Sequence, residues 1–401
     1  MGMSYLRNGS VDNVFLPAFS VGMLAWGLIM SFFLARLKAR YMGKWSEDIG
    51  ISGTEDVNTD ADFQSTVDPE TGELEYFYPR WKHMAKRGVS IALLAVPAAV
   101  VVAAGLGALE LRSHLIVMEQ PPLGGIAAGV ATAAIMYLVT RLMCFHWSGV
   151  LTHWENYTST SDFYYSYAAK CFCLESLAHL FPIMFIMLLN FPIISGNLPA
   201  NERSILDALA IQATSVFLVY YVCTAGAHMW AMYQWSLAAT VVAERTGSQQ
   251  GAPDFSDEEQ ACRPVYRGQL QSGVHVLILM IYSFVLAPVC PVAPVLAYMW
   301  IMHRLSWDKT ALVYTFQRPH PHVSRGPGFW MDSFGAVVVL ALVVQIPLVL
   351  FCTHALSYMS PSVTLEERWG LAVGLELLVI GSASYALLSG LFKGNGRKID
   401  V

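Results

Sequence analysis

The sequence predicts an all-α, polytopic integral membrane protein: a helical bundle of about nine transmembrane helices in a single domain over residues 1–401. Hydrophobic residues make up 55% of the chain and charged residues only 13%, whereas a soluble domain carries about 25% charged residues. Several uncharged runs also reach or exceed the roughly 20 residues that cross a bilayer as a helix. Together these observations predict membrane spans along the whole chain.

The first half of the chain contains four predicted spans separated by polar segments. Their expected limits are residues 13–35, 88–109, 123–144 and 170–194. Residues 45–80 hold ten of the 29 acidic residues and are predicted to form an acidic loop on the cytoplasmic side. The aromatic and polar stretch 146–167 is predicted to lie at the membrane interface.

The second half begins with one unusually long apolar run. Residues 208–243 contain no Asp, Glu, Lys or Arg, which predicts a single long helix that projects beyond the bilayer. A polar linker at residues 244–267 is expected to follow it. The last two predicted spans cover residues 333–352 and 369–392.

The stretch that organises the prediction is residues 268–308. No charged residue occurs from 268 to 303, a run too long for one membrane helix and about right for two. Proline lacks a backbone donor and clashes with the preceding turn, so Pro288, Pro291 and Pro294 predict that one helix ends here and another begins.

The distribution of basic residues predicts the orientation of the bundle. With nine spans the connecting segments alternate between two sides, and 20 of the 24 Lys and Arg residues fall on one of them. Because cytoplasmic segments are enriched in Lys and Arg, this side is expected to be cytoplasmic. The N-terminus is then predicted outside and the C-terminus inside.

Ionisable residues inside spans are functional candidates, because burying them in a membrane is costly. Glu175 and His179 stand at positions i and i+4 and are expected to pair with Arg141, as a structural clamp or alternatively as the lining of a hydrophilic groove. Glu376 lies among glycines in the last span and suggests close helix packing or a dimer contact. The candidate polar core comprises Arg141, Glu175, His179, His228 and Glu376.

The sequence gives no indication of an enzyme. It contains no catalytic-triad order, phosphate-binding loop or paired loop carboxylates, so no catalytic residue and no cofactor is expected. A net charge of −5 gives no reason to expect a nucleic-acid partner. His228, His275 and His303 are of a type that binds zinc or copper, but no ligand-pair spacing supports a site, and we expect no metal.

Several stretches resemble the anoctamin family in their order and spacing. They are the FLARLKAR segment at 33–40, the DPETG segment at 68–72, the LTHWEN segment at 151–156, and the proline-hinged helix pair that ends in Arg318-Pro319. By this resemblance the chain is a divergent, N-terminally truncated member that begins at the family's second helix. The resemblance implies an all-helical membrane domain, usually a homodimer, that acts as a calcium-activated chloride channel or a lipid scramblase.

The resemblance also implies that the family's calcium site has degenerated. Its ligand positions fall on Ala225, Met229, Ser272, His275, Arg304 and Asp308. Calcium takes six to eight oxygen ligands, several of them carboxylates, and here one carboxylate remains. Arg304 and Asp308 stand at positions i and i+4 and are expected to form an ion pair that puts an internal cation in the place of the ion.

Two functions are compatible with this reading. The first is a calcium-independent lipid scramblase or ion channel. The alternative is a non-conducting structural or accessory subunit that keeps the fold, without the calcium site, inside a larger complex. The expected partners are membrane lipids and either a second copy of the chain or other membrane subunits.

Overall fold

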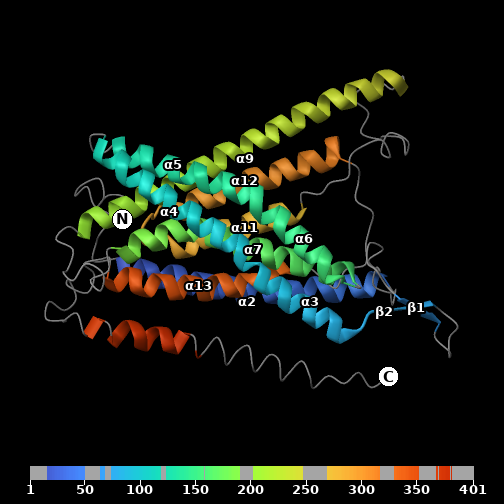
Figure 1. Cartoon of the computed structure of the whole chain (residues 1–401), viewed down its shortest axis with the longest axis horizontal. Coiled ribbons are helices and arrows are strands. Elements are labelled where there is room, and N and C mark those ends of the chain that lie inside the picture. The colour runs from blue at the N-terminus through green and yellow to red at the C-terminus, as the bar shows by residue number, and fades with distance from the viewer. Residues whose placement is uncertain are drawn as a thin grey trace.

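The structure is a computed structural model that describes residues 16–49, 64–67, 74–118, 123–157, 159–189, 202–246, 269–316, 329–351, 367–368, 370–379 and 381. These residues form a bundle of long helices (Figure 1). Five segments are long and apolar enough to cross a membrane, namely Arg80–Leu115, Gly124–Glu155, Thr160–Met187, Leu209–Gln234 and Ser333–Phe351. Shorter apolar helices cover Ala18–Leu34, Ser272–Val285 and Gly370–Val379. The predicted all-α polytopic membrane fold is therefore confirmed.

The region predicted as an acidic loop, residues 45–80, contains regular structure. Helix α2 (Leu16–Ile49) extends into it, and strands β1 (Gln64–Val67) and β2 (Leu74–Phe77) pair antiparallel within it. Thr, Val, Tyr and Phe in the two strands favour extended backbone, a local preference that the acidic composition of the region obscured. Helix α3 (Arg80–Leu93) follows and leads through a one-residue break into α4 (Ala95–Met118).

The stretch predicted to be interfacial, residues 146–167, is mostly helical. Helix α5 (Leu123–Val139), the π-helix η1 (Thr140–Cys144) and α6 (Phe145–Glu155) follow one another without a break. Asn156 ends this continuous helical segment. Its backbone is left-handed, with φ of 60°, a conformation that Asn tolerates better than most residues. Helix α7 (Thr160–Leu189) then begins, so the chain reverses over only a few residues.

The long helix predicted at residues 208–243 is confirmed as α9 (Glu202–Thr246). Its 45 residues correspond to about 67 Å at 1.5 Å per residue, which exceeds the full thickness of a bilayer, about 40–45 Å. In Figure 1 the C-terminal end of α9 extends away from the other helices. The predicted polar linker starts inside this helix, and its remainder, from residue 247 on, lies outside the described residues.

The predicted helix pair at residues 268–308 is confirmed, and its first helix lies at the centre of the bundle. Helix α11 (Gln269–Val285) ends before the proline-containing turn, and α12 (Ala293–Thr310) begins with Pro294 in its first turn, where no backbone donor is needed. Residues 281–290 are all buried. Helix α11 packs against α7, α12 and α13 (Phe329–Phe351), while the π-helix η2 (Ala311–Thr315) extends α12 towards α9.

Helix α4 packs closely against α5 and α7, and two of its glycines allow a matched test. A Cβ atom at Gly105 would lie 2.5 Å from the Phe181 ring on α7, whereas one at Gly107 would meet no atom within 4 Å. We expect Gly105→Leu to destabilise the protein by about 1–3 kcal/mol through overpacking, and Gly107→Leu to be neutral. Thermal unfolding in detergent measures both, and equal midpoints for the two variants would contradict this packing.

Candidate functional site

The first polar cluster in the bundle surrounds Arg304 and joins α9, α11 and α12. We define the Arg304 cluster as Arg304, Asp308, His228 and Ser272. The Arg304 residue is only 5% exposed. Its Nη2 donates to Ser272 Oγ at 2.8 Å, its Nη1 lies 2.6 Å from His228 Nε2, and its Nε lies 3.4 Å from Asp308 Oδ1. The predicted ion pair between Arg304 and Asp308 is therefore confirmed.

The chemistry of the guanidinium group determines the state of its neighbours. A guanidinium can only donate hydrogen bonds, so the His228 ring nitrogen that it contacts acts as the acceptor. One fixed positive charge thus links side chains from three helices, and Asp308 supplies the compensating negative charge.

The two α9 residues that the resemblance places at calcium-ligand positions are not the ones that contact Arg304. Met229 is 57% exposed, and Ala225 is half-buried. His228 is the α9 side chain that reaches Arg304. A signal for this face existed in the sequence, because Tyr220, Thr224 and His228 recur at four-residue spacing, the period of one helix face.

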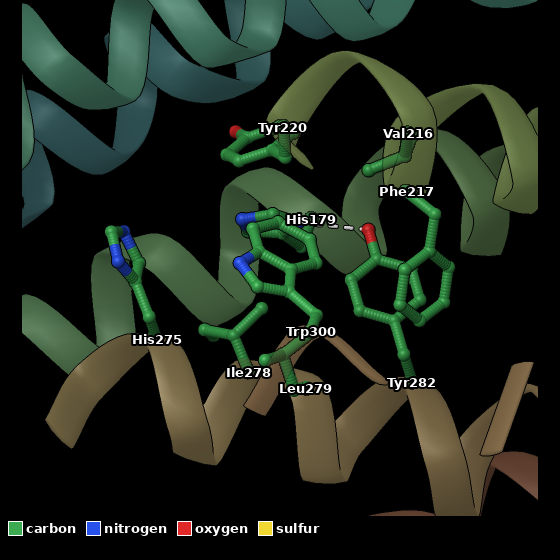
Figure 2. Close-up of a pocket in the computed structure, with 9 residues that line it drawn as sticks. All are labelled: His179, Val216, Phe217, Tyr220, His275, Ile278, Leu279, Tyr282 and Trp300. Carbon is green, nitrogen blue, oxygen red and sulfur yellow. Dashed lines mark hydrogen bonds between the residues drawn. The ribbon is translucent and has the colours of Figure 1, made fainter. Parts of the chain in front are cut away.

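The second polar cluster lies deeper in the bundle, between η1, α7, α9 and α11. We define the Glu175 cluster as Glu175, His179, Tyr220, His275 and Tyr282. His179 Nδ1 lies 2.8 Å from the Tyr282 hydroxyl, and the His179 and Tyr220 ring centroids are 4.1 Å apart (Figure 2). His275 Nε2 lies 4.0 Å from Glu175 Oε1. His275, which the resemblance placed at a calcium-ligand position, therefore neighbours Glu175.

The expected pairing of Arg141 with Glu175 is not formed. Arg141 Nε donates instead to the Tyr137 hydroxyl, one turn earlier, at 3.3 Å. Arg141 belongs to the π-helix η1, whose wider turn changes the direction of its side chain relative to a regular helix. Among the described residues, the basic group nearest to the Glu175 carboxyl group is His275 from α11.

A small cavity lies beside the Glu175 cluster. His179, Tyr220, His275 and Tyr282 line it together with apolar side chains including Phe217, and its inner surface is almost entirely apolar (Figure 2). Its free space is about that of one water molecule. A cavity of this size is far too small for a hydrated ion or a lipid headgroup.

A third cluster, which the sequence did not predict, joins the ends of α6 and α7. We define the Lys170 cluster as Lys170, Glu155, Ser166 and Thr152. Lys170 Nζ lies 2.9 Å from Glu155 Oε1, and it also donates to Ser166 Oγ and Thr152 Oγ1. The Glu155 side chain is fully buried, and its backbone carbonyl bonds to His83 of α3. The cluster therefore fixes three helices at this corner.

The remaining candidate, Glu376, is half-buried on the short helix Gly370–Val379. A Cβ atom at Gly370, Gly374 or Gly381 would meet nothing within 4 Å, so these glycines do not mediate close packing within the described part of the chain. Across the described ranges, no group of three His, Cys, Asp or Glu side chains is arranged to hold a metal ion.

Comparison with known proteins gives one family. The family model for anoctamin, described as a calcium-activated chloride channel, matches residues 1–389 of this chain. No curated protein matches the sequence. The matched range covers nearly all 401 residues, including every helix described above.

Proposed function

The chain belongs to the anoctamin family, and from this premise we propose that it is an ion channel or lipid scramblase whose activity does not depend on calcium. The members of this family are membrane transport proteins rather than enzymes. The chain itself is an integral membrane protein with several helices able to span a bilayer. The observation that supports calcium independence is the position of Arg304.

Arg304 makes the Arg304 cluster a poor site for a divalent cation. Its guanidinium occupies the space between α9, α11 and α12 and contacts the polar side chains that face it. A fixed positive charge within a few ångströms repels a second cation, and repulsion is stronger in a low-dielectric interior than in water. The cluster offers one carboxylate and one hydroxyl, whereas calcium takes six to eight oxygens.

The hydrogen bonds of Arg304 also hold the three helices together, a role that a bound cation would otherwise have. Arg304 holds Ser272 of α11 and His228 of α9 against α12 by direct hydrogen bonds. Breaking these contacts would take two hydrogen-bond partners from a buried charge, which is costly. The three helices are therefore expected to remain associated whether or not calcium is present.

The test is reconstitution of the purified protein into liposomes, with lipid scrambling and ion flux measured in parallel. We expect activity that changes less than about twofold between calcium-free buffer and the micromolar range in which calcium sensors respond. An increase of more than about tenfold with calcium would contradict the proposal. Empty liposomes provide the baseline.

The alternative, a non-conducting accessory subunit, is supported by the closed interior of the bundle. The cavity beside the Glu175 cluster has room for about one water molecule, and the surrounding core is apolar. An accessory subunit would show neither scrambling nor ion flux when reconstituted alone. It would also be purified from native membranes at a fixed ratio to other subunits, whereas a transport protein would be isolated active, alone or with a second copy.

A further inference from the structure

The Glu175 carboxyl group lies in the middle of the bundle without a hydrogen-bond donor. The residue is 1% exposed, and neither carboxyl oxygen has a hydrogen-bond partner among the described residues. The gap of 4.0 Å between Oε1 and His275 Nε2 is longer than a direct hydrogen bond. A group able to form two to four hydrogen bonds is thus buried with none.

The neighbouring His275 and His179 also have buried polar atoms without a hydrogen-bond partner. His275 Nδ1 and His179 Nε2 are buried and have no hydrogen-bond partner within the described ranges, while the other nitrogen of His179 contacts the Tyr282 hydroxyl. Both imidazoles line the cavity that has room for one water (Figure 2). Unpartnered carboxyl and imidazole atoms therefore gather in one small region of the bundle interior.

The burial of Glu175 determines which protonation state is favourable. An ionised carboxylate with no donor is strongly disfavoured in an apolar interior, whereas a carboxylic acid is neutral and donates one hydrogen bond. The groups outside the cluster that interact electrostatically with its members include Arg141 and Cys144 from η1, Tyr137 from α5, Cys171 from α7, and Arg304 and His228 from α12 and α9. The two arginines oppose a second proton on His275, so one proton is the favoured occupancy.

We propose that Glu175, with His275 and His179 beside it, forms an intramembrane proton-binding site that holds one proton on the Glu175 carboxyl group. The proton comes from solvent, and no other reactant is needed. This site is independent of the function proposed above.

The polarity of the surroundings indicates the side from which the site exchanges its proton. On α9 and α11, Thr224, His228 and Ser272 continue the polar face from the Glu175 cluster to the Arg304 cluster. In the other direction the cavity is closed by Phe217 and other apolar side chains, among them Val216, Ile278, Leu279 and Trp300. The arrangement therefore favours exchange of the proton with solvent at the Arg304 end. It does not favour conduction of protons through the whole bundle.

Infrared difference spectroscopy of the purified protein at neutral pH tests the proposal. Subtracting the spectrum of Glu175→Gln from that of the wild type should reveal the C=O stretching band of one protonated carboxylic acid. Glu110→Gln is the matched control, because the Glu110 side chain is 75% exposed and should contribute a carboxylate band instead. A carboxylate band in the Glu175→Gln difference spectrum would overturn the proposal.

Two further measurements keep the test decisive if Glu175→Gln does not fold. Wild-type protein with ¹³C-labelled glutamate should show a protonated glutamate band that shifts on labelling and again in D₂O. The absence of any such band would overturn the proposal. In His275→Ala this band should move, because the carboxylic acid loses its nearest basic neighbour among the described residues, and an unchanged band would show that His275 takes no part in binding the proton.

Discussion

Replacement of Arg304 by methionine is expected to lower the thermal unfolding midpoint in detergent by on the order of 5–10 °C. Methionine preserves much of the aliphatic packing of the side chain but removes the charge and all of its donors. Asp308 would lose its ion pair with Arg304, and Ser272 and His228 would lose a shared partner. Breaking a fully buried pair costs about 3–5 kcal/mol, and the 20% exposure of the Asp308 side chain places this pair at the lower end.

The control for this prediction is Arg80→Met, at the exposed start of α3, which should shift the midpoint by no more than about 1–2 °C. If Arg304→Met matched Arg80→Met, the Arg304 guanidinium would merely reach the membrane interface.

Arg304→Glu sharpens the test, because it places a second carboxylate one helical turn from Asp308. The two carboxylates repel, so this variant should unfold below Arg304→Met in calcium-free buffer. Millimolar calcium should raise its midpoint, because ligands that bind only the folded state stabilise it, and should leave the wild type unchanged. Calcium stabilisation of the wild type would contradict the picture of an internal cation.

The second large effect is expected for Lys170→Met, which should also cost about 3–5 kcal/mol. Lys170 Nζ lies 2.9 Å from Glu155 Oε1, with side-chain exposures of 7% and 0%. The variant would leave the Glu155 carboxylate buried with no cation within ion-pair distance. Because Glu155 ends α6 and contacts α3 through its backbone, we expect the corner of α3, α6 and α7 to loosen first. Thermal unfolding and hydrogen exchange at this corner measure the effect.

A double variant separates loss of the charge pair from loss of packing. Lys170→Met combined with Glu155→Gln removes both charges and should recover a substantial part of the stability lost in Lys170→Met alone. Lys82→Met, on the exposed face of α3, serves as the surface control and should be close to neutral. If the double variant were less stable than Lys170→Met, the pair would stabilise the protein through packing and hydrogen bonds and not through charge compensation.

The positions of the helices could be predicted from the sequence because the requirement is local. A run of apolar residues long enough to cross a bilayer must satisfy its own backbone hydrogen bonds, so it forms a helix wherever it occurs. Pro288, Pro291 and Pro294 separated α11 from α12 for an equally local reason. The Arg304–Asp308 pair was predictable too, since both residues belong to one helix and helix geometry alone brings them together.

The rotation of each helix about its axis was decided only by the tertiary structure. In a membrane protein the lipid-facing and core-facing surfaces are both apolar, so hydropathy does not mark the inner face as it does in water. His228 is therefore the α9 side chain that reaches Arg304, and Glu175 lies beside His275 of α11, whereas Arg141 was expected as its partner. Composition and the lengths of the apolar runs determined that this chain is a membrane-embedded helical bundle, whereas helix-to-helix packing determined which polar side chains meet inside it.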